Sequence, residues 1–527
     1  MYLDRSDLEF RNTVLSGAYV DKSAMISHLN AKITLSSKFF LISRPRRFGK
    51  TYAAKMLNSY YSKHLDSAEI FDNLAISHDP SYKKHLNKYN VFYIDMQAFA
   101  DFNDPDGLHY LERFNKALCA DMMSHFPKVF ETTNTDNFVD AVINAFSIYK
   151  EQFVFIIDEW DFMLRTYKDQ KLISAFINML RLLFKSDDGA QCCALVYMTG
   201  VLPIIRYNTE SALNNFVEYT MVSPKNLAPY FGFTEDEVKS LCNKHHVPFM
   251  QAKKWYDGYR LGDYEIYNPR AIDMLCSTHN FENYWSETGY QSVVSSVLKL
   301  NIDNVRDDLL TLLDGDDIRS VDFDAFNSDL QNLTSRDSIL AYLVHLGYLA
   351  CNQGRIYIPN EEIKIALKQD LKRAQYPEFL RKYESSAKFI QNILKQDRDA
   401  VAEYLEKLHS QSTSMLTYNS EEALRFLVLK AMFASDEYYQ NEFQELPTGK
   451  GFADLVYLPK PSEINKVPAL VIELKCSQDV YTAISQIHEK QYMQAVKGAC
   501  KAVLLVGINY DKKTKKHTCM IEEGNLD

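Results

Sequence analysis

The sequence predicts an α/β protein in three parts, and three successive patterns along the chain support this prediction. Over residues 1–235, short apolar runs alternate with stretches of helical periodicity, which favours a parallel sheet covered by helices on both faces. Over residues 236–415 the pattern becomes one of helices joined by short turns. Over residues 416–527 a helix leads into a strand-loop-strand-helix-strand unit. We therefore expect three domains with these boundaries.

The strands of the first part are expected at five short apolar runs rich in β-branched and aromatic residues. Continuous apolar runs of this length are typical of strands buried on both faces. Helical periodicity separates several of the runs, most clearly at 107–126 and 172–183. The expected strands are residues 39–42, 91–96, 153–157, 194–198 and 219–222.

A phosphate-binding loop is predicted between the first strand and a helix-like stretch at 52–60. The loop reads Arg-Pro-Arg-Arg-Phe-Gly-Lys-Thr, and a strand followed by a tight loop ending in Gly-Lys-Thr and a helix is the layout of a P-loop. Backbone N–H groups, the helix dipole and the Lys50 ammonium would converge on the β- and γ-phosphates of ATP. Thr51 would offer its hydroxyl to Mg²⁺. We expect nucleotide contacts from Arg44, Pro45, Arg46, Arg47, Phe48, Gly49, Lys50 and Thr51.

The loop departs from the standard P-loop pattern at its first position. That position normally holds glycine, which turns without a Cβ penalty, and this chain has Arg44 there. Residues 23–65 contain no Asp or Glu but many Lys and Arg, in a chain of net charge -10. Such a basic island favours a bound polyanion. The alternative is a solvated basic loop beside a core strand.

The strand expected at 153–157 ends in two carboxylates, Asp158 and Glu159. In P-loop enzymes an Asp at this place helps to hold Mg²⁺, and an adjacent Glu can orient and deprotonate the attacking water. The strand expected at 194–198 is followed by Thr199, which could contact the γ-phosphate or the water. Arg206 lies shortly downstream and is a candidate arginine finger, although a surface arginine is an equally good interpretation.

These segments resemble the AAA-ATPase-like family of predicted bacterial ATPases, in which Arg-Pro-Arg-Arg-Phe-Gly-Lys-Ser/Thr replaces the usual loop. Arg44 therefore matches the family although it departs from the general motif. The resemblance implies an AAA- or STAND-type P-loop ATPase whose helical middle region acts as a lid or coupling domain. It extends over residues 19–23, 43–51, 158–159, 199–202, 214–216, 231–235, 255–259, 267–269, 284–285 and 347–349.

The last part of the chain carries a second set of charged residues on two expected strands. Asp454 is on one strand, and the next expected strand holds Glu473 and Lys475. Residues i and i+2 of a strand share a face, so Glu473 and Lys475 point the same way. Asp454 on the neighbouring strand would complete a carboxylate pair able to hold Mg²⁺ or Mn²⁺. The metal would polarise a phosphate, and Lys475 could position water or stabilise developing charge.

This order of residues is that of the PD-(D/E)XK nucleases, and the region resembles the module of that superfamily that commonly follows the AAA-ATPase-like domain. The resemblance implies a restriction-endonuclease-like αβββαβ core closed by a final strand at 502–506. It also implies an accessory role for Gln486, and an acidic metal ligand at Glu421 or Glu422 on the preceding helix, of which we take Glu421. The alternative is that Glu473 and Lys475 form a surface pair on an edge strand.

The overall composition narrows the class of protein. We find no apolar run near the roughly 18 residues needed to span a bilayer, and the first ten residues are too charged for a secretory signal. The nine cysteines form no C-x-x-C pair, so neither a zinc site nor a disulfide framework is expected. We expect a cytoplasmic protein without membrane contact.

The predicted function is ATP binding and hydrolysis coupled to a metal-dependent nuclease that acts on DNA or RNA. ATP would move the lid and so gate cleavage. Two alternatives stay open: a STAND-type nucleotide-dependent switch or scaffold with a non-cleaving nuclease-like domain, and an effector or defence protein. A homo-oligomer is a further expectation, because AAA-type sites often use a neighbour's arginine.

Overall fold

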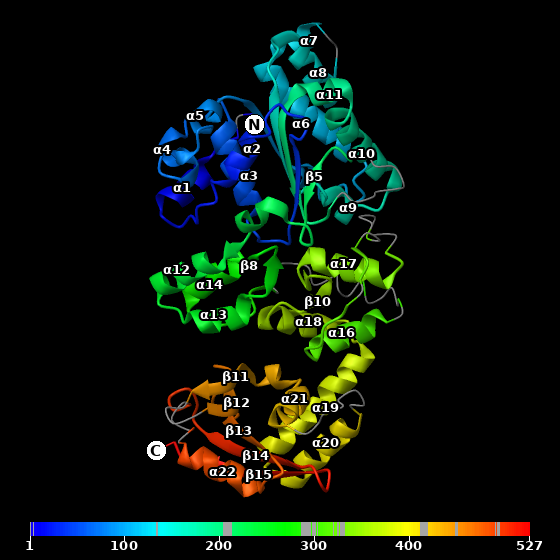
Figure 1. The fold of residues 1–527 in the computed structure, drawn as a ribbon. Helices are drawn as coiled ribbons and strands as arrows, with labels where there is room; N and C mark the ends of the chain where they lie inside the picture. Colours follow the sequence, from blue (N-terminus) through cyan, green and yellow to red (C-terminus); the bar gives the residue numbers. More distant parts are fainter. Residues whose placement is uncertain are drawn as a thin grey trace. The chain divides into compact units, whose positions relative to one another are not determined.

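The computed structural model describes residues 2–526 except residues 4, 133–134, 204–212, 286–296, 298–301, 303, 320, 324–325, 327–332, 412–419, 448–451, 491 and 493–495. Its internal contacts divide the chain into two compact units, Met1–Ala366 and Leu367–Asp527. Figure 1 shows the elements of each unit. The first unit holds both the expected ATPase part and most of the expected middle part, and the three-domain boundaries stay a prediction.

The first unit contains a five-stranded, all-parallel sheet in the order β2-β3-β4-β1-β5. One strand, β4, lies between β1, which leads into the P-loop, and β3, which ends in Asp158. Four of the expected strands are found, but β5 ends where the fifth prediction begins, because its parallel ladder with β1 stops at the pair Ile42 and Tyr219. The strands are β1 (Phe39–Ser43), β2 (Asn90–Asp95), β3 (Phe153–Asp158), β4 (Cys193–Gly200) and β5 (Val217–Tyr219).

Helices cover both faces of this sheet, as Figure 1 shows. Successive side chains of β1 alternate between two cores: Phe40 and Ile42 pack with the first group of helices, and Phe39 and Leu41 with the second. The first group is α1 (Leu8–Leu15), α2 (Met25–Asn30), α3 (Lys50–Tyr61), α4 (Ala68–Phe71) and α5 (Tyr82–His85). The second is α6 (Tyr110–His125), α7 (Pro127–Thr132), α8 (Phe138–Tyr149), α9 (Phe162–Thr166), α10 (Gln170–Phe184) and α11 (Asp187–Cys192).

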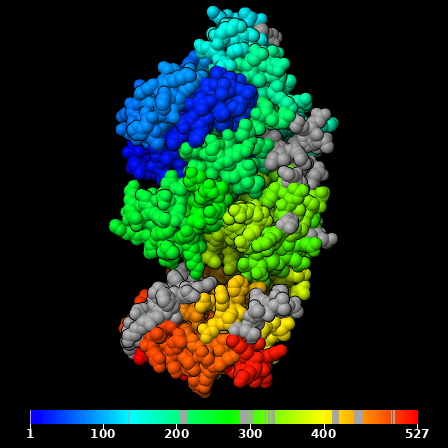
Figure 2. All heavy atoms as spheres, in the orientation of Figure 1, coloured from blue at the N-terminus to red at the C-terminus, as the bar shows by residue number. Residues whose placement is uncertain are grey.

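The middle of the chain is mainly helical, as predicted, and it also contains two small antiparallel sheets that the sequence pattern does not predict. Figure 2 shows this part, in green, beside the blue N-terminal helices. An ion pair of 2.6 Å between Lys22 and Glu237 joins the two parts. Its helices are α12 (Glu235–His245), α13 (Phe249–Tyr256), α14 (Pro269–Thr278), α16 (Val305–Leu313), α17 (Arg336–Leu346) and α18 (Glu361–Arg373). Its strands are β6 (Phe233–Thr234), β7 (Tyr259–Leu261), β8 (Tyr264–Tyr267), β9 (Ala350–Asn352) and β10 (Arg355–Tyr357).

The second unit is a five-stranded mixed sheet in the order β11-β12-β13-β14-β15, packed with helices. Only β13 and β14 are parallel, and α22 makes the crossover between them. This is the expected αβββαβ core. The elements are α19 (Pro377–Leu394), α20 (Arg398–Gln411), α21 (Glu421–Ala431), β11 (Tyr439–Pro447), β12 (Phe452–Pro459), β13 (Ala469–Cys476), α22 (Val480–Glu489), β14 (Val503–Asp511) and β15 (Lys516–Gly524).

The prediction that the strand at 502–506 is the last one is wrong. That strand, β14, continues to Asp511 and is followed by β15, which pairs with it in antiparallel. The Asp511 carboxylate accepts hydrogen bonds from the N–H groups of Lys513 and Thr514, at 2.7 and 3.0 Å. These bonds close a tight, lysine-rich turn that reverses the chain.

Within the part of the chain that the structure describes, every helix is too short or too polar to cross a bilayer.

Candidate nucleotide-binding and metal-binding sites

The P-loop joins the end of β1 to the first residue of α3. Gly49 has φ 84°, a conformation that glycine adopts without a Cβ penalty, and α3 begins at the next residue, Lys50. The Lys50 ammonium is buried inside the loop and donates to the carbonyl oxygens of Arg44 and Pro45, at 3.0 and 2.9 Å. A phosphate bound in the loop would compete with these carbonyl oxygens for the Lys50 ammonium.

The acidic end of β3 lies beside this loop, as the sequence predicts. Burial lowers the pKa of Lys50, and the charges of Glu159 and Asp158 act in the opposite direction. Burial raises the pKa of Asp158 to about 6, while a hydrogen bond with Thr51 lowers it. The two residues expected to hold Mg²⁺ at the nucleotide, Thr51 and Asp158, are therefore neighbours. A hydroxyl and a carboxylate are ligands that Mg²⁺ accepts.

Thr199 lies at the end of β4, where Ile42 of β1 pairs with it. Its hydroxyl is buried and has no hydrogen-bond partner among the described residues. Buried polar atoms without partners are rare in native proteins and call for an explanation such as a missing ligand. This orphaned hydroxyl is consistent with the predicted role of Thr199 at the nucleotide. Arg206, the candidate arginine finger, lies outside the described residues.

Arg44 is fully buried, and its side chain points to the end of β5. Its Nη1 donates to the carbonyl oxygens of Ser43 and Tyr219, both at 2.8 Å. The guanidinium lies 5.5 Å from the centre of the Phe231 ring, and burial lowers its pKa to about 9. Its side chain therefore ties the P-loop to β5, and the prediction that Arg44 contacts the nucleotide stays a prediction.

The middle region packs directly on the P-loop. Pro45 lies against Gly347, the residue that ends α17. The Phe48 ring meets the Tyr259 ring edge-on at 5.2 Å. Burial raises the pKa of Glu362 to about 8, and the nearby charge of Arg47 acts against this. Arg44 thus faces the end of the sheet, and Phe48 packs on the expected lid.

Replacing Gly347 with alanine is expected to loosen this contact. Gly347 has φ 87°, and a Cβ there would lie 2.7 Å from the Trp285 ring and 2.9 Å from Pro45. Backbone strain and overpacking should together lower the free energy of unfolding by about 2–4 kcal/mol. Gly354→Ala is the matched control, because Gly354 also has a positive φ but open space around it. Chemical denaturation of both variants tests this, and equal losses would contradict the contact.

The three predicted residues of the nuclease-like site come together at one end of β12 and β13. Leu455 pairs with Ile472, which places Asp454 and Glu473 side by side on the neighbouring strands. One oxygen of Asp454 accepts from the Leu474 N–H at 2.8 Å. On β13, the ammonium of Lys475 lies 2.9 Å from Glu473 Oε1. β13 has a strand on each side, so Glu473 and Lys475 do not form a surface pair on an edge strand.

Glu473 is the most buried acidic group of this site, with 2% of its surface exposed. Burial, followed by the charge of Asp454, raises its pKa to about 7, and Lys475 acts against this rise. Its second oxygen, Oε2, is buried without a hydrogen-bond partner among the described residues. A carboxylate pair with one orphaned oxygen fits a hard divalent cation.

The accessory residues lie in or near this group. Gln486 on α22 donates to the hydroxyl of Tyr492 at 3.2 Å. The Tyr492 hydroxyl in turn feels the charges of Glu473 and Asp454. Burial lowers the pKa of Lys475, but Glu473 and then Glu421 raise it, and the net shift is upward. The charge of Glu421 at the start of α21 therefore acts on Lys475, and the choice of Glu421 over Glu422 as a metal ligand stays a prediction.

Sequence reasoning missed two arginines that hold the predicted carboxylates. Arg425, on α21, donates to Oδ1 of Asp454 at 2.8 Å, so a metal at this oxygen would compete with a guanidinium. Arg165, on α9, pairs with Glu159. Arg425 stands one helical turn after Glu421 and Arg165 four residues after Asp161, spacings that place side chains on one helix face. That spacing was the signal available in the sequence.

Mn²⁺ binding at the nuclease-like site is expected to weaken as the pH falls below 7. The pKa of Glu473 is raised to about 7, so acidification protonates a carboxylate that a cation needs charged. Each pH unit below 7 should raise the Kd for Mn²⁺ by up to about tenfold. Titration calorimetry between about pH 8 and pH 6 measures this, with Glu473→Gln as the control that should bind weakly at every pH. A Kd that stays constant in the unchanged protein would contradict it.

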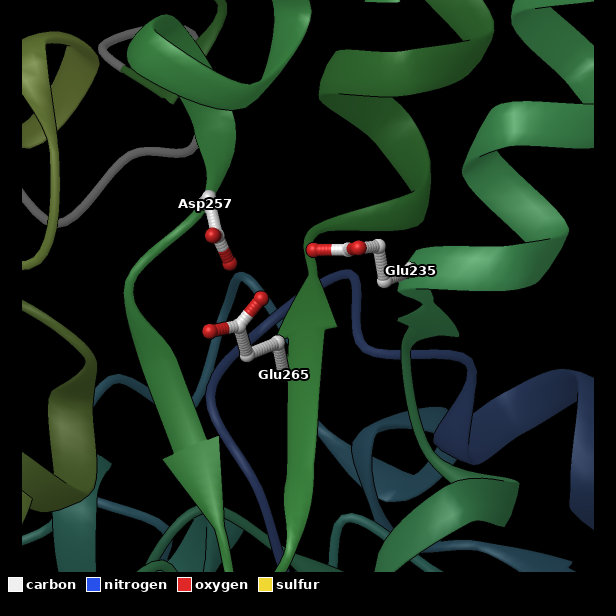
Figure 3. A group of neighbouring side chains, drawn as sticks. All are labelled: Glu235, Asp257 and Glu265. Carbon is white, nitrogen blue, oxygen red and sulfur yellow. The ribbon is translucent and has the colours of Figure 1, made fainter. Parts of the chain in front are cut away.

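A third acidic group, Glu235, Asp257 and Glu265, lies in the middle region, where the three carboxylates point toward one another (Figure 3). Lys253 fills this group. Its ammonium pairs with Glu235, lies 2.9 Å from Glu265 and is 3.7 Å from Asp257. We therefore interpret these residues as an ion-pair cluster that joins α12, α13 and β8.

The fold and the two groups of residues define a P-loop ATPase-like protein with a nuclease-superfamily domain. Residues 9–209 match the AAA-ATPase-like family, described as predicted AAA-ATPase, and residues 420–519 match the PD-(D/E)XK nuclease superfamily. These two matches agree with the domain architecture that the sequence predicts, an AAA-ATPase-like part followed by a PD-(D/E)XK nuclease-superfamily part.

Individual proteins are also similar to this chain. The uncharacterized protein in the vnfD 5′ region of Azotobacter chroococcum mcd 1 is 22% identical over 390 residues, which cover 68% of this chain and 67% of that protein. Among solved structures, the Walker-type ATPase of Pyrococcus abyssi is 13% identical with a TM-score of 0.33, covering 66% of this chain and 96% of that chain.

Proposed function

We propose that the first unit binds and hydrolyses ATP with Mg²⁺, and that the second unit cleaves nucleic-acid phosphodiesters with Mg²⁺ or Mn²⁺. The observation that carries the proposal is the convergence of Asp454, Glu473 and Lys475 at the end of two adjacent strands, with Glu473 Oε2 buried and unpartnered. A buried charged set of this kind is costly to fold, so it favours a function over a structural role.

At the nucleotide site, each residue has a distinct proposed task. Lys50 would leave the loop carbonyls and neutralise the β- and γ-phosphates. Thr51 and Asp158 would hold the metal, and Glu159 would orient and deprotonate water. Thr199 would use its orphaned hydroxyl on the γ-phosphate or the water.

At the nuclease-like site, Asp454 and Glu473 would hold the cation, with Glu421 as a more distant acidic contributor. A bound cation would polarise the scissile phosphate and lower the pKa of water. Lys475 is already held by Glu473, and its ammonium would stabilise charge that develops on the phosphate. Gln486 would keep its place through Tyr492.

Cleavage assays test this proposal directly. Single- and double-stranded DNA and RNA are incubated with the purified protein and Mg²⁺ or Mn²⁺, with and without ATP. We expect metal-dependent cleavage of at least one substrate that ATP alters and that Asp454→Ala abolishes. Lys50→Ala should remove only the effect of ATP. Absence of cleavage on every substrate, or full cleavage by Asp454→Ala, would overturn the nuclease half of the proposal.

A second candidate is a nucleotide-dependent switch in which neither site turns over quickly. The middle region packs on the P-loop through Gly347 on Pro45 and Tyr259 on Phe48. This packing favours a switch, because a nucleotide bound at the P-loop would directly change the contacts of the expected lid. A switch predicts ADP retained through purification and a change of oligomeric size when ATP is added. Light scattering with ADP and ATP distinguishes the two candidates.

A further inference from the structure

Three charged residues form a chain beside the P-loop that the proposed mechanism uses only at one end. The Arg165 guanidinium pairs through Nη2 with Oε2 of Glu159 and through Nε with Oδ2 of Asp161, the second bond at 2.9 Å. All three side chains are largely buried, with exposed fractions of 10% for Arg165, 15% for Glu159 and 0% for Asp161. Because these charged side chains are largely shielded from water, the positions of their charged groups are more tightly fixed than those of an exposed ion pair.

The far end of this chain is fixed to the sheet. Oδ2 of Asp161 accepts hydrogen bonds from the backbone N–H groups of Val201 and Leu202, at 3.1 and 2.9 Å. A Cβ on Gly200 would lie 2.6 Å from Asp161 Oδ1, so only glycine allows this approach. The segment that directly follows Thr199 on β4 therefore sets the position of Asp161, and Asp161 sets that of Arg165.

The near end is Glu159, the proposed base. Its backbone has φ 54°, a left-handed conformation that costs energy for any residue other than glycine. Among the described residues, Oε2 is the carboxylate oxygen of Glu159 that accepts a hydrogen bond, from Arg165. Glu159 Oε1 is left to accept a hydrogen bond from water. Glu159 directly follows Asp158 at the end of β3, and its charge acts on Lys50 of the P-loop.

We infer that Arg165 is the positioning residue of the ATPase: by bridging Asp161 and Glu159 it holds the Glu159 carboxylate so that Oε1 faces the attacking water. A base that is itself oriented by a third group is a recurring catalytic arrangement. Arginine suits this bridge because its planar fork offers donors to two carboxylates at once, which a lysine ammonium on a flexible stem does not do with fixed geometry. The inference rests on the proposed ATPase function.

A double-mutant cycle on the full chain tests the inference. Turnover of radiolabelled ATP is measured for Arg165→Met, Glu159→Gln and the double variant. Arg165→Met should lower kcat by about 10²-fold, within the range that a general base contributes, while the Kd for ATP changes less than about threefold. In the Glu159→Gln background the same change should alter kcat less than about twofold, because Arg165 acts through Glu159.

Two further variants keep the test sound. Arg165→Lys retains the charge and should recover part of the lost kcat, about tenfold, without reaching the unchanged protein. Arg11→Met removes a similar bridge, to Asp7 and the Asp66 carbonyl, at the far end of α3, and should leave kcat unchanged. Melting temperatures establish that each variant is folded. If Arg165→Met is not folded, Arg165→Lys replaces it in the double-mutant cycle.

Each outcome decides a different point. No ATP turnover by the unchanged protein overturns the proposed ATPase and this inference with it. Turnover by the unchanged protein with kcat preserved in the Arg165 variants overturns the inference alone. An equal loss of kcat in the Glu159→Gln background also overturns it, because Arg165 would then act independently of Glu159.

Discussion

Replacing Lys50 with methionine is expected to lower kcat/KM for ATP hydrolysis by at least about 10²-fold and to weaken ATP binding. The Lys50 ammonium is buried among the P-loop carbonyls of Arg44 and Pro45 and near the carboxylates of Asp158 and Glu159. It is thus a desolvated cation at the place where we propose that the phosphates bind. Losing one preorganised donor of this type typically costs about 10²–10³-fold in rate.

Lys55→Met is the matched control for this variant. Lys55 is on the same helix, α3, but pairs with Glu9 at 2.5 Å near the surface. Loss of such a pair costs about 1 kcal/mol or less, so turnover should be unchanged. Initial-rate assays on both variants, with ATP binding followed by a fluorescent analogue, make the comparison. Equal activities in Lys50→Met and Lys55→Met would remove the basis for a phosphate site at this loop.

Replacing Glu473 with glutamine is expected to abolish metal-dependent cleavage, with a loss of about 10³-fold or more, without unfolding the second unit. The carboxylate is buried and its pKa is raised to about 7, first by burial and then by Asp454. Glutamine has the same shape but lacks the charge that attracts a hard cation. Because burial disfavours the charged form, the neutral amide should keep or raise the melting temperature.

The control for Glu473→Gln is Glu463→Gln. Glu463 lies between β12 and β13 and pairs with the exposed Lys466 at 2.9 Å. The same change of charge and atoms there should leave both cleavage and metal affinity unaltered. Loss of cleavage in both variants would point to a general effect of charge, and retained cleavage in Glu473→Gln would exclude this carboxylate from the metal site.

The fold of both units could be predicted because their strands are continuous apolar runs with unambiguous spacing. The strand that ends in Asp158 is found where it was expected. The strand that holds Glu473 and Lys475 pairs with the strand of Asp454, as predicted. The prediction at 219–222 begins at the last residue of β5, because a three-residue strand is defined by its register with β1. A single apolar run does not determine that register.

The parts of the sites that could not be predicted depend on contacts between distant segments. Nothing local in the loop sequence indicates that Arg44 reaches Tyr219, or that Pro45 meets Gly347. Likewise, helical spacing relates Arg165 to Asp161 and Arg425 to Glu421, but it does not indicate that these arginines pair with Glu159 and Asp454. Local motifs identify the groups that meet ligands, whereas the residues that hold those groups in place are supplied by tertiary packing.

The central claim is that this chain carries two separate sites for divalent cations, one that requires ATP and one that does not. The most direct measurement is the number of Mn²⁺ ions bound per chain, determined by titration with and without a non-hydrolysable ATP analogue. We predict one ion without the analogue and two with it. Lys50→Met should remove only the second ion and Glu473→Gln only the first. A single ion under all conditions, or the loss of both ions in either variant, would contradict the claim.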